Sequence, residues 1–253
     1  MSANPYGHLC TEFYALDKPA APPDALDFYV DHARRANGPI LEPMCGTGRF
    51  LLPLLEQGFD AEGCDHSKDM LAACRARAAE LGLSPRLHER SIEDPPRERQ
   101  FGLVFIPSGS FSLLTNDAVI RSSLRAIHAA LLPGGTFVVE VERLQPMPTT
   151  TSGTWGGRWL ERPDGAKLVI SWLTQYSASE GISRSLHRYE LIRNGELLST
   201  EFEDFELRFH EPAAFSALLF EAGFTAITPL KPYTSEPPDD SDDGVVFVAR
   251  KPR

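Results

Sequence analysis

A short apolar run passes into a glycine-rich loop at Leu41-Glu42-Pro43-Met44-Cys45-Gly46-Thr47-Gly48. The apolar run is too short for a helix and is typical of a buried strand. The two glycines allow a tight turn that exposes backbone amides, and the helical pattern that follows would point its positive end at this loop. Asp65 ends the next apolar run, where a carboxylate can accept both hydroxyls of a ribose. The pattern predicts a nucleoside site at the carboxyl ends of two strands.

Outward from this loop, short apolar runs alternate with helical patterns between residues 38 and 141. This alternation indicates repeated βαβ units on a parallel sheet. The predicted strands are 39–42, 60–64, 85–89, 101–106 and 136–141. The predicted helices are 24–37, 50–57, 67–82 and 118–132, the last one ended by Pro133-Gly134-Gly135.

The pattern changes after residue 145 to an alternation of polar and apolar residues, which is typical of antiparallel strands. Turn pairs Asp164-Gly165, Glu180-Gly181 and Asn194-Gly195 separate the predicted strands and indicate hairpins. The predicted strands are 154–162, 166–178, 182–193 and 196–209, and a helix at 213–222 and strands at 225–230 and 244–250 finish the chain. We therefore expect an α/β domain from residues 23–145 and 210–253, with an antiparallel β insertion at 146–209.

Composition excludes several classes of protein. The 253 residues are 42% hydrophobic, which is enough for one large core. The net charge of −10 and the acidic cluster Asp239–Asp243 argue against a nucleic-acid partner. The 4 cysteines lack zinc-ligand spacing, so we expect reduced thiols and no metal site. No apolar run approaches the ~20 residues that span a bilayer, and no secretory signal is visible, so we expect a cytoplasmic protein with no membrane partner.

A dinucleotide-binding protein is the main rival, because it also needs a glycine turn followed by a ribose-binding acid. The third glycine of its G-x-G-x-x-G pattern would stand at position 51, which is Leu51. A leucine there removes the close helix–strand packing on which dinucleotide binding depends. The loop therefore fits one nucleoside better than two.

Three motifs in this order resemble those of class I S-adenosylmethionine-dependent methyltransferases. They are Leu41–Gly48, Gly63-Cys64-Asp65-His66-Ser67-Lys68-Asp69-Met70-Leu71 and Leu131-Leu132-Pro133-Gly134-Gly135-Thr136-Phe137. The resemblance implies an α/β fold with a Rossmann-like seven-stranded sheet in the order 3-2-1-4-5-7-6, strand seven being antiparallel. The late β insertion is similar to that of small-molecule N-methyltransferases, including amino-sugar dimethyltransferases, in which an added sheet covers the acceptor pocket.

The resemblance also implies which residues bind the cofactor, S-adenosylmethionine. Glu42 would lie near the methionyl ammonium, Asp65 on the ribose, and His66 and Met70 beside the adenine. The implied set is Glu42, Met44, Cys45, Gly46, Thr47, Gly48, Asp65, His66, Met70, Ser91, Ile92, Glu93, Pro107 and Ser108. Two positions depart from the family, since an Asp is usual at Ser91 and a glycine is usual at Met44; Glu93 or Asp94 could substitute for the first.

The segment before the α/β domain is unusually aromatic for a free tail. In the similar N-methyltransferases this segment is a helix that folds over the cofactor and brings an aromatic hydroxyl toward the sulfonium. Residues 1–22 are therefore expected to form a cap, with Tyr14 as the catalytic residue. The expected acceptor-side residues are Tyr6, Ser110, Phe111, His187 and Tyr189.

The expected activity is transfer of a methyl group from S-adenosylmethionine to a small molecule, at an amine nitrogen. An amine that arrives unprotonated needs no strong base, and no His/acid pair emerges from the sequence. Two alternatives stay open: O-methylation of a small metabolite, and a non-catalytic S-adenosylmethionine-binding sensor or scaffold. The acceptor and the oligomeric state are left open.

Overall fold

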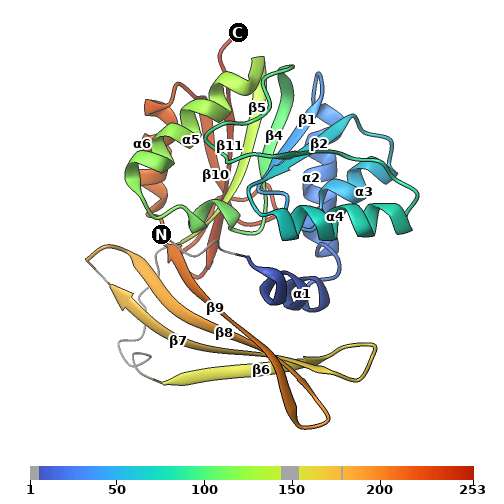
Figure 1. Cartoon of the computed structure of the whole chain (residues 1–253). Coiled ribbons are helices and arrows are strands. Elements are labelled where there is room, and N and C mark those ends of the chain that lie inside the picture. The colour runs from blue at the N-terminus through green and yellow to red at the C-terminus, as the bar shows by residue number, and fades with distance from the viewer. Residues whose placement is uncertain (1–5, 144–153, 178) are drawn as a thin grey trace.

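Two sheets make up the molecule, one of seven strands and one of four. The structure is a computed structural model that describes residues 6–143, 154–177 and 179–253. The large sheet has the order β10-β11-β5-β4-β1-β2-β3 and carries helices on its faces (Figure 1). With β11 and β10 as strands seven and six, this is the predicted order 3-2-1-4-5-7-6, which is confirmed.

The central sheet is parallel except for one strand. Its strands are β1 (Ile40–Pro43), β2 (Ala61–Asp65), β3 (Arg86–Glu89), β4 (Phe101–Ile106), β5 (Leu131–Glu142), β10 (Thr225–Leu230) and β11 (Gly244–Arg250). Strand β11 runs antiparallel to both neighbours, in register with β5 from Gly244 opposite Glu142 to Arg250 opposite Thr136. The carboxyl ends of β1, β2, β4 and β5 therefore meet at one edge, where ligands bind in such sheets.

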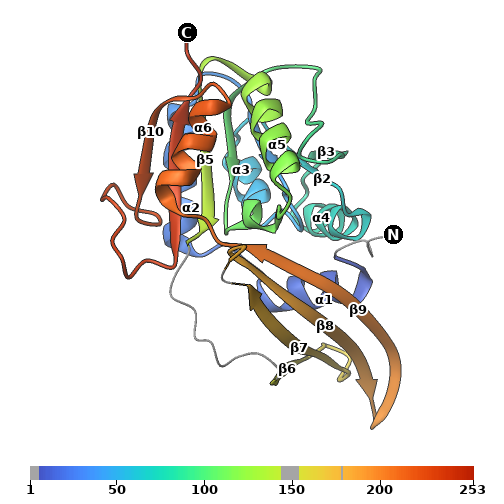
Figure 2. The same ribbon diagram turned by 90° about the vertical axis from the view of Figure 1, so that its left-hand side faces the viewer.

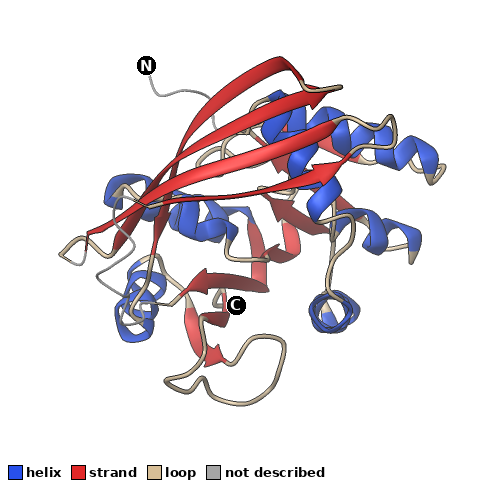
Figure 3. Cartoon of the chain, turned by 90° about the horizontal axis from the view of Figure 1, so that it is seen from below, coloured by secondary structure: helices blue, strands red, loops and turns tan. Residues whose placement is uncertain are grey.

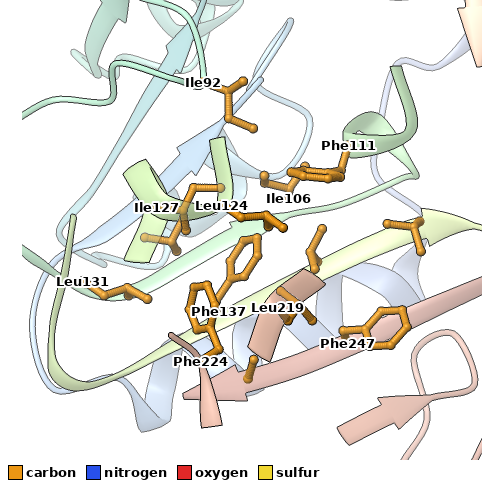
Figure 4. Packing of buried hydrophobic residues seen from close by; sticks show 14 of the residues in the cluster. Ile92, Ile106, Phe111, Leu124, Ile127, Leu131, Phe137, Leu219, Phe224 and Phe247 are labelled. Carbon is orange, nitrogen blue, oxygen red and sulfur yellow. The ribbon is translucent and has the colours of Figure 1, made fainter. Parts of the chain in front are cut away.

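Helices cover the central sheet on both faces (Figure 2). They are α2 (Pro23–Arg35), α3 (Leu51–Glu56), α4 (Lys68–Glu80), α5 (Asp117–Ala130) and α6 (Pro212–Glu221), with a 3₁₀ turn η1 at Ser110–Leu113. Side chains of strand β4 are buried on both faces of the sheet. Val104 and Ile106 pack with α5 and α6. Leu103 and Phe105 pack with α2 and α3. Figure 4 shows the cluster under α5 and α6. Burial on both faces explains why this strand is a continuous apolar run.

Strand β5 begins earlier than the sequence indicates. It was expected to start at Thr136, after a helix that continued to Leu132, but it starts at Leu131, directly after α5. The pairing with β4 jumps from Phe101 opposite Leu131 to Leu103 opposite Thr136, so Pro133-Gly134-Gly135 forms a bulge inside the strand. Proline and glycine were interpreted as a helix stop, whereas here they accommodate a β-bulge, in which Gly134 has φ +78°.

The small sheet is an antiparallel meander, seen from below in Figure 3. Its strands are β6 (Trp155–Glu161), β7 (Lys167–Ser177), β8 (Ile182–Arg193) and β9 (Glu196–Arg208), within one residue of the predicted bounds. The expected start of the insertion at residue 146 and the expected strand end at 178 lie outside the described residues. Hairpin turns contain glycines with positive φ at Gly165, Gly181 and Gly195, as the turn pairs predict.

Helix α1 (His8–Asp17) lies against the small sheet on one side and α4 on the other (Figure 1). Its residues Leu9, Cys10 and Phe13 pack against Leu168, Ile170 and Tyr189 of the sheet.

Two carboxylates of β9 hold the amino-terminal end of α1. The Leu9 N–H donates to Glu201 Oε2 at 2.9 Å, and the Tyr6 N–H donates to Glu203 Oε1 at 2.7 Å. The N-cap residue, Gly7, has no side chain, so Glu201 satisfies an amide that a capping side chain would otherwise bind. The helix is thereby joined to the insertion.

None of the helices in the described ranges is long and apolar enough to cross a membrane.

Candidate active site

The loop between β1 and α3 has a left-handed backbone at several positions. Met44, Gly46 and Gly48 have φ values of +57°, +53° and +76°. At Gly48 a Cβ atom would come within 2.6 Å of Cys74 Sγ and 2.9 Å of Leu52 Cγ, so both the backbone and the packing require glycine. The expectation of a tight glycine turn is met at this position.

Met44 occupies a conformation that side-chain-bearing residues rarely adopt. This explains why a glycine is usual there in the family that the motifs resemble. The side chain of Met44 lines both cavities described below. The departure from the family pattern therefore adds apolar surface to the site at a local backbone cost of about 1–3 kcal/mol.

Asp65 joins the glycine loop to the end of β2. Its Oδ2 accepts the Gly46 N–H at 2.9 Å, and its Oδ1 accepts the Ser67 N–H at 2.9 Å. A carboxylate oxygen has more than one lone pair, so each oxygen can still accept a hydroxyl. The residue is 8% exposed and lines both cavities. This geometry suits a carboxylate that accepts the two hydroxyls of a ribose.

Glu42 is a buried carboxylate with an unsatisfied oxygen. It is 2% exposed, and no group in the described part of the chain donates a hydrogen bond to Oε2. Burial raises the pKa of Glu42 well above its usual range, and the positive charge of Arg49 acts in the opposite direction. A buried carboxylate oxygen of this kind needs a cationic or hydrogen-bonding partner. The ammonium of the cofactor's methionyl end fits that requirement.

Two neighbouring cavities lie at this edge of the sheet. The larger has a volume of about 770 Å³ and the smaller about 40 Å³. Tyr6, Met44, Asp65 and His66 line both, so the two are parts of one site. The smaller cavity has room for only a few water molecules, so the methionyl end of a cofactor requires side chains there to shift.

The residues expected around the adenine surround these cavities. His66, with a side chain 41% exposed, lines both, and Met70 lines the smaller one. Ser91, Ile92 and Glu93 line the larger one, and Glu93 Oε1 accepts a hydrogen bond from Ser122 Oγ.

The aromatic residues before the α/β domain also reach the site. Tyr14 and Tyr6 line the smaller cavity together with Ser110, and the two tyrosine rings meet edge to face at 6.4 Å. The Tyr14 ring lies near two cations, the Arg49 guanidinium at 5.6 Å and Lys18 Nζ at 5.4 Å. Burial raises the pKa of Tyr14, so its hydroxyl keeps its proton and can donate a hydrogen bond.

Three expected acceptor-side residues do not line either cavity. Phe111 is fully buried and packs edge-on against Phe215 at 5.5 Å, because η1 turns its ring into the core. His187 stacks on Phe205 at 4.8 Å, and the Tyr189 hydroxyl donates to Glu203 Oε2 at 3.2 Å. The last two share the face of β8 that α1 covers.

Some expected cofactor residues act below the cavities. Cys45 and Thr47 are buried under the glycine loop, and Pro107 is buried at the end of β4. Ser108 donates its N–H to Glu140 Oε2 at 2.7 Å and accepts from Arg49 Nη2 at 2.8 Å. Neither Pro107 nor Ser108 lines a cavity, so Ser108 positions Arg49 and does not face the cofactor directly.

Sequence reasoning missed much of the larger cavity's wall. The η1–α5 region and the insertion supply Leu113, Leu114, Thr115, Val119, Leu173, Gln175, Arg184, Ser185, Leu186, Asp204, Phe205 and Glu206. Thr115 Oγ1 donates to Glu206 Oε2 at 2.7 Å, and Arg208 Nη1 donates to the Thr115 carbonyl at 3.0 Å, which joins the two elements. The alternation in β7–β9 indicates which residues share a face of the small sheet. It does not indicate which part of that face lines the cavity beside the α/β domain.

Comparisons with known proteins agree with this geometry. Residues 40–135, which contain the glycine loop and Asp65, match the family model described as a methyltransferase domain. A protein of Geobacillus sp. (strain WCH70) that carries a methyltransferase name is 24% identical over 91% of this chain and 94% of its own length. The dTDP-3-amino-3,6-dideoxy-alpha-D-glucopyranose N,N-dimethyltransferase of Streptomyces fradiae is 33% identical over 40% of this chain and 38% of its own.

A solved structure shows the same fold over the full length. The sugar N-methyltransferase from Streptoalloteichus sp. ATCC 53650 aligns with 100% of this chain and 96% of its own at a TM-score of 0.77, with 20% sequence identity. The fold and the site thus define a class I methyltransferase architecture with an inserted antiparallel sheet. Residues 40–135 thus match a methyltransferase domain, and the whole chain has the fold of a solved S-adenosylmethionine-dependent methyltransferase.

Proposed function

We propose that this enzyme methylates an amine nitrogen of a small polar molecule. The observation that carries the proposal is an enclosed site: strands β7–β9 line the larger cavity together with Asp65 and His66, and Tyr14 of α1 lines the smaller one. An acceptor has to fit inside that cover, which suits a metabolite better than a macromolecule. The chain's net charge of −10 points in the same direction, away from nucleic acid.

The names of similar proteins support nitrogen as the acceptor atom. One relative acts on an amino sugar attached to a nucleotide, and the structural neighbour is a sugar N-methyltransferase. Tyr14 is poorly suited to remove a proton from a hydroxyl acceptor, because burial raises its pKa.

In this proposal the chain's residues bind, align and shield the reactants. Bound S-adenosylmethionine supplies an electrophilic methyl group. Asp65 and the Gly46 loop hold the ribose side, Glu42 holds the ammonium, and His66, Ser91 and Ile92 enclose the adenine. The α1 helix and the insertion exclude water and fix the acceptor, which is most of what an in-line displacement requires of a protein. Residues 6–17 and the sheet β6–β9 are the proposed cover.

A labelling experiment tests the acceptor atom. The full chain is incubated with S-adenosylmethionine that carries a CD₃ group and with two matched acceptors, dTDP-3-amino-3,6-dideoxy-α-D-glucopyranose and its 3-hydroxy counterpart. Mass spectrometry then locates the label, and a wider panel of amino sugars and amino acids is run alongside. We expect CD₃ on amine nitrogens. Label on a hydroxyl, with the matched amine untouched, would contradict the proposal.

A further inference from the structure

A row of paired residues crosses the four strands of the small sheet, which lie side by side in Figure 3. Trp155 of β6 pairs with Leu173 of β7. Leu173 pairs in turn with Leu186 of β8, and Leu186 with Asp204 of β9. Directly opposite residues in antiparallel strands point to the same side of a sheet, so these side chains form one strip, which we call the Trp155 row. Because side chains alternate along a strand, this row lies on the face opposite to Leu168, which α1 covers.

Most of the Trp155 row is already a wall of the larger cavity. Leu173, Leu186 and Asp204 line that cavity together with Asp65. Trp155 does not line it, but it stands directly beside Leu173 and is 50% exposed. The apolar surface therefore continues from the cavity wall onto the open face of the sheet. A ligand that extended out of the cavity along this row would reach Trp155.

Two further side chains enlarge this surface. Phe202 stands two residues before Asp204 on β9, so it shares the face of the row, and it is 58% exposed. The guanidinium of Arg188 lies over the Trp155 ring at 5.5 Å from its centroid. A cation over the ring restrains the indole, and a restrained aromatic side chain binds a ligand at a lower entropic cost. Aromatic side chains gathered in the open are typical of a binding surface.

The two ends of the row differ in chemistry. The outer end, at Trp155, is aromatic, whereas the end on β9, the strand beside η1, carries the negative charge of Asp204. Arg184, which also lines the cavity, is neutralised by Glu206 at 2.9 Å and Glu180 at 2.6 Å, so it does not cancel that charge. Such a wall complements an elongated molecule with a cationic end toward the α/β domain and an apolar end toward the open face.

We propose that the exposed face around Trp155 and Leu186 binds an apolar ring of the acceptor, while the amine-bearing end of the acceptor enters the larger cavity. The acceptor is then an amphipathic amine. This inference rests on the proposed function and narrows it, because it adds an apolar ring to the polar end that carries the amine. Continuity with the cavity favours the acceptor over a second copy of the chain, since a protein surface would cover Trp155 and Phe202 without entering the cavity.

Two amines that differ only in a phenyl ring, n-butylamine and 4-phenylbutylamine, test this subsite. The full chain is saturated with S-adenosylhomocysteine, and NMR titration gives the dissociation constant of each amine. The indole N–H signals of Trp155, Trp159 and Trp172 report where the amine binds, and replacing each tryptophan by phenylalanine assigns them. We expect 4-phenylbutylamine to bind about tenfold more tightly and to shift the Trp155 signal most. Equal affinities in the wild type would overturn the inference.

Variants of exposed aromatic residues provide the second arm of the test. Trp155→Ser should reduce the preference for the phenyl compound to about twofold or less, while n-butylamine and S-adenosylhomocysteine bind as before. If that variant fails to fold, Phe202→Ser takes its place and should reduce the preference by about half or more. Phe220→Ser on α6 is the matched control, because Phe220 is 70% exposed and lines neither cavity, and it should keep the full preference. An undiminished preference in Trp155→Ser, or the same loss in Phe220→Ser, contradicts the subsite.

Two further measurements separate the competing explanations. Sedimentation velocity shows whether the face joins two copies of the chain: a dimer that Trp155→Ser dissociates, with no preference for the phenyl ring, refutes the subsite. The CD₃ labelling described above separates the subsite from the proposed function. Label on a hydroxyl group together with the tenfold preference refutes nitrogen as the acceptor atom and supports the apolar subsite. Label on nitrogen without any preference refutes the subsite alone.

Discussion

The Gly46 N–H and Asp65 Oδ2 are joined by a hydrogen bond of 2.9 Å, which connects the loop after β1 to the end of β2. The same carboxylate accepts the Ser67 N–H at the start of α4 through its other oxygen. Asp65 therefore fixes the loop and the start of α4 at once, so the part of the site that we propose for the ribose is ordered without a ligand. Preorganisation of this kind reduces the ordering cost of binding.

Replacing Asp65 should therefore weaken cofactor binding. In Asp65→Ala we expect the affinity for S-adenosylhomocysteine to fall about 10- to 100-fold, the ~1.5–3 kcal/mol of a hydrogen bond to a charged group. Calorimetry measures it, with circular dichroism to verify folding. Glu80→Ala, an exposed acid on α4, is the matched control and should bind normally. Undiminished affinity in a folded Asp65→Ala protein would rule out the ribose role.

Tyr14 should affect turnover more than affinity. Tyr14→Phe removes only the hydroxyl, so we expect kcat to drop about 10- to 100-fold, or ~1.4–2.7 kcal/mol, while the dissociation constant for S-adenosylhomocysteine barely changes. Tyr176→Phe on β7 serves as the control. Rates are measured with the acceptor identified by CD₃ labelling. Normal turnover in Tyr14→Phe, together with a loss of stability in Tyr14→Ala, would make the residue a packing group only.

The two glycines Gly48 and Gly58 separate the cost of backbone strain from that of a steric clash. Both have positive φ, +76° and +83°, but nothing lies within 4 Å of a Cβ at Gly58, whereas Cys74 Sγ is 2.6 Å from one at Gly48. We expect Gly58→Ala to lower the free energy of unfolding by about 1 kcal/mol and Gly48→Ala by about 2–4 kcal/mol. Urea denaturation measures both. Equal losses would show that the packing under the glycine loop is looser than described.

Glu201 should fix α1 to the insertion. Glu201→Ala leaves the Leu9 N–H without its acceptor, and we expect a loss of about 1 kcal/mol, as for a removed N-cap. Hydrogen exchange should accelerate in residues 8–12 more than elsewhere. Glu196→Ala, exposed at the start of the same strand, should leave exchange in α1 unchanged. Uniform acceleration across the whole chain would indicate general destabilisation and contradict a local role.

Stability should depend on pH through Glu142. Burial, together with the charges of Glu140 and Asp243, raises the folded-state pKa of Glu142 from the usual 4.5 to about 7. Folding therefore favours the protonated form, and the stabilisation is present below pH 4.5 and lost as pH rises through 7. Glu142→Gln mimics the protonated form. We expect its free energy of unfolding to match the wild type near pH 4.5 and to exceed it by up to about 3 kcal/mol at pH 8. Identical curves at both pH values would contradict a raised pKa.

The sequence predicted best those features that depend on residues close together along the chain. The glycine loop and the strands follow from neighbouring residues, because turn geometry and strand periodicity are set by a few positions, whereas the order of the strands came from the family resemblance. The surroundings of Glu142 and Arg49 could not be predicted this way, since they come from Gly109, Asp243 and α1, which are distant along the chain. Phe111, His187 and Tyr189 have suitable chemistry for an acceptor site but line neither cavity, because packing decides which side of an element is buried.

The place of Tyr6 has a practical consequence for handling this enzyme. Tyr6 lines both cavities, and its N–H is held by Glu203, so the described part of the chain begins beside the site. Arg253 lies beside Gly134, at the amino-terminal part of β5 and therefore at the opposite edge of the central sheet. Affinity tags and immobilisation handles belong at the carboxyl terminus. An amino-terminal fusion would be expected to slow ligand exchange, and its proteolytic removal to restore it.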